Sequence, residues 1–78
     1  MKIRTENEVK EFNAALDKCV SDVWLIGAND EHYNMKKEAE YARGLARIMG
    51  DEGDQLGIFT TSYEDEIIMM NICNKLAA

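Results

Sequence analysis

Three stretches of the chain repeat apolar residues every three or four positions, which is the period of an amphipathic helix. In the first stretch Phe12 and Leu16 share one face. Thr5 and Glu8 stand at the spacing of a capping box, in which each side chain satisfies a backbone N–H near the start of the helix. The pattern predicts a helix over residues 6–18.

Two further helices are predicted. The second lies between Asn34, which can cap its start, and Gly50, a residue that commonly ends helices. Its expected apolar face comprises Met35, Ala39, Ala42, Ala46 and Met49, widened by Tyr41, Leu45 and Ile48. Gly44 inside it costs about 1 kcal/mol relative to Ala, which close packing against a neighbour would explain. The third helix follows Ser62, with Asp65 at the position that completes a capping-box variant. Its expected buried stripe is Ile68, Ile72 and Leu76, flanked by Met69 and Cys73.

Four short segments have the character of strands: residues 1–4, 22–26, 31–35 and 56–60. The second segment is apolar on both faces, which indicates a central strand covered by helices on one side, with Trp24 toward the open side. Gly27 to Asp30 has turn chemistry, so the second and third segments are expected to form a hairpin. The third segment is short and polar, as edge strands often are. In chain order the elements are strand, helix, two strands, helix, strand and helix, which is typical of an α+β fold.

Composition narrows the class of protein without indicating a reaction. A chain of 78 residues is short for more than one domain, so we expect a single domain over residues 1–78. The net charge of −6 repels phosphate backbones and anionic lipid surfaces, so neither nucleic acid nor a membrane is an expected partner. Residues 1–12 lack the apolar core of a signal peptide, and no run approaches the roughly 18 apolar residues of a membrane span. We therefore expect a cytoplasmic protein.

Few residues offer reactive chemistry. His32 lies beside the hairpin turn and is followed by no glycine-rich anion nest, so a solvated surface histidine is expected. The acidic residues Asp51, Glu52 and Asp54 lack the twelve-residue pattern of a calcium loop and are typical of a solvated turn. Neither a dinucleotide nor a phosphate-binding glycine motif occurs, and no nucleophile motif does. We expect no catalytic residue, no metal and no cofactor.

The sulfur-containing residues have two readings each. Cys19 and Cys73 fall on apolar helix positions and are expected to be buried, reduced thiols, with a disulfide between the first and last helices as the alternative. Methionines usually fill gaps in a core, but an adaptable apolar surface is the alternative. The residues concerned are Met35, Met49, Met69 and Met70, together with Ile67.

Three stretches of the chain resemble HPr, the histidine-containing phosphocarrier protein of the bacterial sugar phosphotransferase system. Residues 21–36 are similar to that family's second hairpin, residues 36–50 to its second helix, and residues 53–76 to its last strand and C-terminal helix. The resemblance implies an open-faced βαββαβα sandwich, with an antiparallel four-stranded sheet and three helices on one face. The first six elements also fit the ferredoxin-like split βαβ plan, which small-molecule sensor modules of the ACT kind use, usually as dimers.

The chain departs from the HPr family where that family carries its chemistry. The family places its phosphorylated histidine at the start of the first helix, in a segment of the form Gly-x-His-x-Arg-Pro, whereas residues 5–9 here are Thr-Glu-Asn-Glu-Val. Glu6 and Glu8 would repel an incoming phosphoryl group, and His32 lies on the wrong hairpin. Lys37 stands where the resemblance implies a regulatory serine. The resemblance therefore implies a scaffold and argues against phosphocarrier activity.

These observations predict a non-catalytic HPr-like domain that acts as a protein-interaction or regulatory module. One basic stripe on an otherwise acidic chain, at the start and outer face of the second helix, is the predicted docking site for a partner protein. Its members are Lys36, Lys37, Arg43 and Arg47. The alternatives are an enzyme or phosphoacceptor that uses His32, and a ferredoxin-like sensor dimer. A homodimer is compatible with each of these readings.

Overall fold

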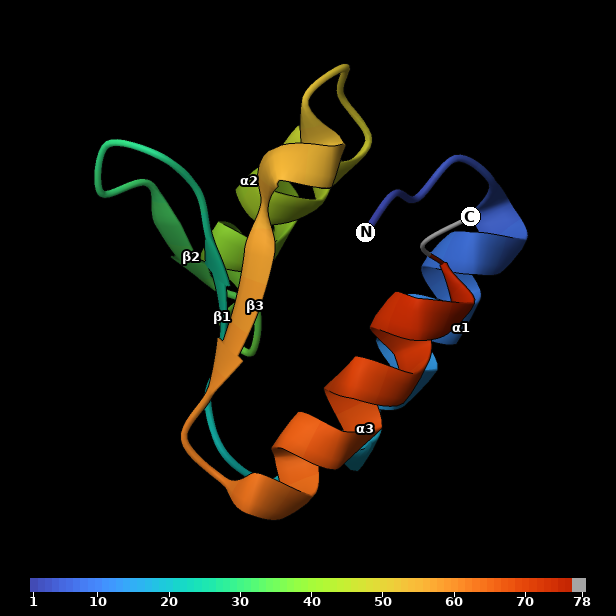
Figure 1. Cartoon of the computed structure of the whole chain (residues 1–78), viewed down its shortest axis with the longest axis vertical. Coiled ribbons are helices and arrows are strands. Elements are labelled where there is room, and N and C mark those ends of the chain that lie inside the picture. Colours follow the sequence, from blue (N-terminus) through green and yellow to red (C-terminus); the bar gives the residue numbers. More distant parts are fainter. Residues whose placement is uncertain (77–78) are drawn as a thin grey trace.

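The computed structural model describes residues 1–76 and shows an antiparallel sheet with helices on one side of it (Figure 1). The elements are α1 (Glu6–Lys18), β1 (Val23–Ile26), β2 (His32–Asn34), α2 (Glu38–Ile48), the 3-10 turn η1 (Gly53–Gln55), β3 (Gly57–Thr60) and α3 (Tyr63–Lys75). The strand order is β2-β1-β3, and both neighbours of β1 run antiparallel to it. The predicted α+β class, the hairpin and the central position of the first hairpin strand are confirmed.

Only one face of the sheet is covered by helices in the described part of the chain. Val23 and Leu25 of β1 are fully buried, whereas Ile26 on the opposite face is 41% exposed. Leu25 pairs with Tyr33 of β2 and Ile58 of β3, so these three side chains point to the covered face. The core that fills this face takes Phe12 and Leu16 from α1, Ile48 from α2, and Met69 and Ile72 from α3. Figure 1 shows α1 and α3 side by side against it.

The first helix begins and ends at its predicted residues. Thr5 Oγ1 accepts the N–H of Glu8 at 3.2 Å, and Glu8 Oε1 accepts the N–H of Thr5 at 3.1 Å, so the predicted capping box is confirmed. The hairpin turn is also as predicted. Asn29 and Asp30 have φ angles of 57° and 63°, a left-handed conformation that short polar side chains tolerate.

The predicted strand over Met1–Arg4 is wrong: the described residues form a sheet of three strands. Glu8 Oε1 also accepts the N–H of Arg4 at 2.7 Å, so the helix cap uses a donor that a fourth strand would need. The N–H of Lys2 lies 3.4 Å from the carbonyl oxygen of Leu76 at the end of α3. Ile3 is nevertheless buried at 1% exposure, so the apolar side chain was correctly expected to face the core.

The second helix starts later than predicted and buries a different face. Asn34 does not cap it. Its side-chain oxygen accepts the N–H of Lys36 at 3.0 Å and holds a turn, and α2 begins only at Glu38. The inner face is then formed by Tyr41, Gly44, Leu45 and Ile48, while Ala39, Ala42, Ala46 and Met49 are exposed. Met35 is buried but lies before the helix, so it does not define the inner face of α2 as the predicted pattern assumed.

Gly44 is explained by close packing of α2 on β2. A Cβ at this position would lie 2.6 Å from the sulfur of Met35 and 3.2 Å from Cβ of Tyr33. Met35 and Tyr33 are both buried, so the helix can approach the strand only where it carries no side chain.

Asp65 joins the start of α3 to the loop that follows α1. Ser62 caps α3 as predicted, since its Oγ accepts the N–H of Asp65 at 3.4 Å. The predicted capping-box role of Asp65 is wrong. Its carboxylate is 1% exposed and accepts the N–H groups of Val20 and Ser21, at 3.0 and 2.8 Å. A buried carboxylate is tolerated only when it is hydrogen-bonded in this way.

We expect Asp65→Ala to lower the free energy of unfolding by about 3 kcal/mol, because two backbone donors lose a charged acceptor. Urea denaturation followed by circular dichroism measures this quantity. Glu64→Ala, one residue earlier and exposed, is the matched control and should change the free energy by no more than about 0.5 kcal/mol. Equal effects of the two substitutions would contradict the structural role of Asp65.

Candidate interaction surfaces

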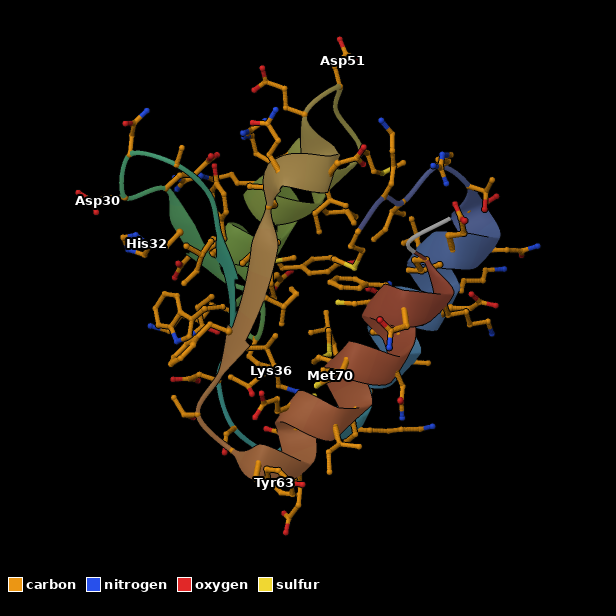
Figure 2. All side chains as sticks on the ribbon, in the orientation of Figure 1. Asp30, His32, Lys36, Asp51, Tyr63 and Met70 are labelled. Atoms are coloured by element: carbon orange, nitrogen blue, oxygen red, sulfur yellow. The ribbon has the colours of Figure 1, made fainter. Side chains whose placement is uncertain are left out.

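Lys36, the first residue of the predicted docking stripe, stabilises the fold by binding the end of α1. Its ammonium donates to the carbonyl oxygens of Leu16 and Cys19, at 2.7 and 2.9 Å. These carbonyls lie at the C-terminal end of α1, where the helix dipole is negative and a cation is favoured. Figure 2 shows Lys36 reaching inward between the sheet and the helices. Its charge is therefore directed at α1.

Arg47 of α2 is held by Glu31, the residue just before β2. Its Nε lies 2.5 Å from Glu31 Oε2, and a terminal guanidinium nitrogen lies 3.0 Å from Oε1, the two-point geometry of a strong ion pair. Tyr33 donates its hydroxyl hydrogen to the same carboxylate at 2.6 Å. The hydrogen bonds from Arg47 and Tyr33 lower the pKa of Glu31 to about 2. The same contacts raise the pKa of Arg47 and of Tyr33.

The other two basic residues face solvent. The guanidinium carbon of Arg43 lies 5.7 Å from the centre of the Tyr33 ring, a cation–π distance. Lys37 is exposed at the N-cap of α2, and within residues 1–76 its side chain makes no hydrogen bond or ion pair. Of the four residues in the predicted stripe, Lys36 and Arg47 therefore stabilise the fold. Lys37 and Arg43 present their charges to solvent.

His32 lies on the open face of the sheet, exposed beside the hairpin turn. Figure 2 shows it next to Asp30, on the side of the sheet away from α1 and α3. Its Nδ1 is 2.6 Å from the backbone oxygen of Asp30, and its ring centre is 5.6 Å from that of Trp24. These partners are a main-chain carbonyl and an aromatic ring. These two contacts fix the orientation of the imidazole on the exposed face of the sheet.

Both cysteines are free thiols in the described structure. Cys19 is buried and donates to the carbonyl oxygen of Ala15, at 3.4 Å, while Cys73 is half-buried with its sulfur 3.7 Å from that of Met1. Burial raises the pKa of both thiols, which favours the unreactive protonated form. Among residues 1–76, no group of three or more His, Cys, Asp or Glu side chains is placed to hold a metal ion.

The uncovered face of the sheet carries large apolar side chains. Trp24 and Ile26 of β1 and Phe59 of β3 share this face with His32, and Phe59 pairs directly with Trp24. Phe59 is 54% exposed. Together with Asp30 and Glu31 these four side chains line a shallow depression of about 480 Å³. We call Trp24, Ile26, His32 and Phe59 the open-face patch.

A second hollow, the β3–α3 groove, lies on the other side of Phe59. It measures about 280 Å³ and is lined by Ile58, Phe59, Thr60, Glu66, Met69, Met70, Cys73 and Asn74. Met70 is 56% exposed at its rim, whereas Met69 is 1% exposed beneath it. Met49 is also exposed, at 47%, so the prediction that methionines fill the core is wrong for Met49 and Met70, and Ile67 lies at the surface with 44% exposure. Met35 and Met69 fill the core.

Sequence reasoning missed that these apolar residues gather around β3. The signal was present in the alternation of β3, which places Phe59 opposite to Ile58. It could not show that no helix of residues 1–76 covers the Phe59 side.

No protein-family model matches the chain, and neither a curated protein nor a solved structure is significantly similar to it. None of the described helices is both long and apolar enough to cross a membrane.

The ion pair of Glu31 predicts a pH-dependent contribution to stability. Because its folded pKa of about 2 lies below the ordinary value of 4.5, the ionised carboxylate stabilises the fold above about pH 4.5. This contribution is lost as the pH falls toward about 2. We expect the difference in unfolding free energy between the wild type and Glu31→Gln to be constant near neutral pH and to shrink over that acidic range.

The titration of the Glu31 carboxyl carbon, followed by NMR, tests the cause directly. Arg47→Gln should move the pKa of Glu31 back toward its ordinary value, because the largest interaction that lowers it is lost. Arg43→Gln is the matched control and should leave the pKa of Glu31 unchanged. A wild-type Glu31 that titrates near 4.5 would show that the ion pair does not form in solution.

Proposed function

We propose that this protein is a non-catalytic protein-interaction module built on an HPr-like scaffold, with its main binding surface on the open face of the sheet. The observation that carries the proposal is the open-face patch: Phe59 and Ile26 are 54% and 41% exposed beside Trp24, on a face that no helix of residues 1–76 covers. Contiguous apolar side chains of this kind mark interaction sites. A partner that covers both gains the hydrophobic stabilisation of two large side chains.

The element order supports the HPr-like scaffold over the ferredoxin-like alternative. After α1 the chain runs through a hairpin, a helix, a strand and a long C-terminal helix, as the resemblance implies. The split βαβ plan with six elements does not require α3, yet α3 supplies Met69 and Ile72 to the core. The described chain departs from the HPr-like scaffold at residues 1–4, which form no fourth strand, so that β3 is an edge within residues 1–76.

The start of α1 supports the non-catalytic part of the proposal. In the family that the chain resembles, this helix start presents the phosphorylated histidine. Here the carboxylate of Glu8 accepts the N–H groups of Arg4 and Thr5, at 2.7 and 3.1 Å. A phosphoryl group arriving there would meet a negative charge that already uses two of the local donors.

A double substitution on the open face tests the proposal. Phe59→Thr with Ile26→Thr keeps strand propensity but removes two of the large apolar side chains of the open-face patch. A partner isolated on the wild-type protein should bind the double variant at least about 30-fold more weakly, since two buried apolar anchors are lost. Titration calorimetry with the purified partner measures the change.

Tyr63→Ala is the matched control for that experiment. Tyr63 is 76% exposed at the start of α3 and does not line the depression of the open-face patch, and Figure 2 shows it at the end of the molecule opposite Asp51. Its removal should leave the affinity unchanged. Equal affinity of the wild type and the Phe59/Ile26 variant, with an unchanged circular dichroism spectrum, would refute the open face as the binding surface.

The basic residues of α2 provide a second candidate surface for an acidic partner. Of the four predicted docking residues, Lys37 and Arg43 direct charge to solvent, so binding through this face would depend on them. Lys36 and Arg47 would act by holding the local structure. The two surfaces differ in chemistry, which allows separate tests.

We expect Lys37→Glu with Arg43→Glu to reduce affinity for an acidic partner by about tenfold and to slow its association, most clearly at low salt. Surface plasmon resonance at two salt concentrations gives both quantities. Lys10→Glu with Lys18→Glu on α1 makes the same change in net charge at exposed positions. If both pairs weaken binding equally, the effect comes from net charge and the α2 face is not the site.

A further inference from the structure

The hydrogen-bonding pattern of β1 shows which backbone groups of β3 are unpaired. The N–H of Met35 donates to the carbonyl oxygen of Val23 at 2.7 Å, and the N–H of Gly27 to that of Glu31 at 2.8 Å. The odd-numbered residues of β1 therefore direct their backbone groups toward β2. By alternation Trp24 and Ile26 direct theirs toward β3, where their partners are Phe59 and Gly57.

The same alternation leaves the N–H and carbonyl groups of Ile58 and Thr60 pointing away from β1. Within residues 1–76 no other strand pairs with β3, and these backbone groups have no other hydrogen-bond partner. The outer edge of β3 contains no charged residue, no proline and no bulge, the devices that usually prevent strand addition. An extended chain is the one type of ligand whose backbone groups match this spacing.

The β3–α3 groove adjoins this edge and provides contacts for side chains. Ile58 and Thr60 line it together with Met69, Met70 and Cys73, whose soft side chains adapt to different shapes. Side chains on one face of an added strand would enter the groove. Those on the other face would extend the open-face patch beside Phe59, so one ligand would cover both surfaces.

The charge of the groove indicates the chemistry of that ligand. Glu66 is exposed and lines the groove, no lysine or arginine of residues 1–76 lines it, and the whole chain carries a net charge of −6. Like charge disfavours a second copy of this chain, and a cationic segment is favoured. We propose that the β3 edge and the β3–α3 groove bind an extended, basic segment of a partner protein, which adds to the sheet as a fourth strand.

This inference rests on the proposed function and specifies its mode of binding. The probe is an eight-residue peptide that alternates valine and threonine and carries lysine at both ends. Amide hydrogen exchange followed by NMR should show that the peptide slows exchange at Ile58 and Thr60. An N-methylated peptide that lacks alternate amide donors should bind about tenfold more weakly, because hydrogen bonds of the added strand are lost.

Charge reversal at the groove provides the matched pair of variants. Glu66→Lys should weaken binding of the basic peptide about fivefold, whereas Glu64→Lys, with the same change in net charge outside the groove, should not. A peptide with glutamate in place of lysine should bind the wild type more weakly than the basic peptide. Calorimetry gives these affinities, and analytical ultracentrifugation gives the mass of the complex.

Three results would overturn the inference. The basic peptide fails to bind, or it binds without slowing exchange at Ile58 and Thr60, or the edge is protected by a dimer of this chain. If a partner still loses affinity on the Phe59→Thr and Ile26→Thr substitutions, the proposed function stands and only strand addition is wrong. If the peptide binds as a strand but those substitutions have no effect on any partner, the open face is wrong and the edge is the site.

Discussion

The fold depends on how the last turn of α1 and the loop that joins it to β1, residues 19–22, are held from two sides. Asp65 of α3 accepts the N–H groups of Val20 and Ser21, while the ammonium of Lys36 donates to the carbonyl oxygens of Leu16 and Cys19. One anion satisfies the donors and one cation satisfies the acceptors of the same short stretch of backbone. These contacts fix the end of α1 relative to α3 and set where β1 begins. The two charged side chains thereby join the helices and the sheet through hydrogen bonds to this stretch of backbone.

Holding the helices in this way gathers them on one face of the sheet. With three strands and all of the described helices on the Leu25 side, the Trp24 side is left as a surface, and β3 is left with an unpaired edge. The apolar residues Ile26 and Phe59 are then exposed by the architecture and are not needed by the core. Large apolar side chains left exposed together are typical of interaction surfaces, which links the one-sided packing to the proposed function.

Local signals predicted the elements well, because their causes lie within a few residues. Thr5 and Glu8 determine the start of α1, and Asn29 and Asp30 determine the hairpin turn. The errors arise where a local signal has a distant competitor. Glu8 also takes the N–H of Arg4, which removes a donor from the expected first strand.

The predicted docking stripe was also misjudged because the partners of its residues are distant in the sequence. Periodicity placed Lys36 and Arg47 on an outer face, but it could not show that their partners are the end of α1 and Glu31. Those partners lie 16 to 20 residues away along the chain. The gathering of apolar residues around Phe59 also required the strand order, which no sequence period reports.

The central claim is that β3 is an edge strand with an uncovered face, and amide hydrogen exchange of the free protein tests it most directly. We expect slow exchange at Gly57 and Phe59, whose N–H groups point to β1, and fast exchange at Ile58 and Thr60, whose N–H groups point away from β1. Slow exchange at all four residues would show that another strand already covers this edge, and β3 would then not be an edge strand.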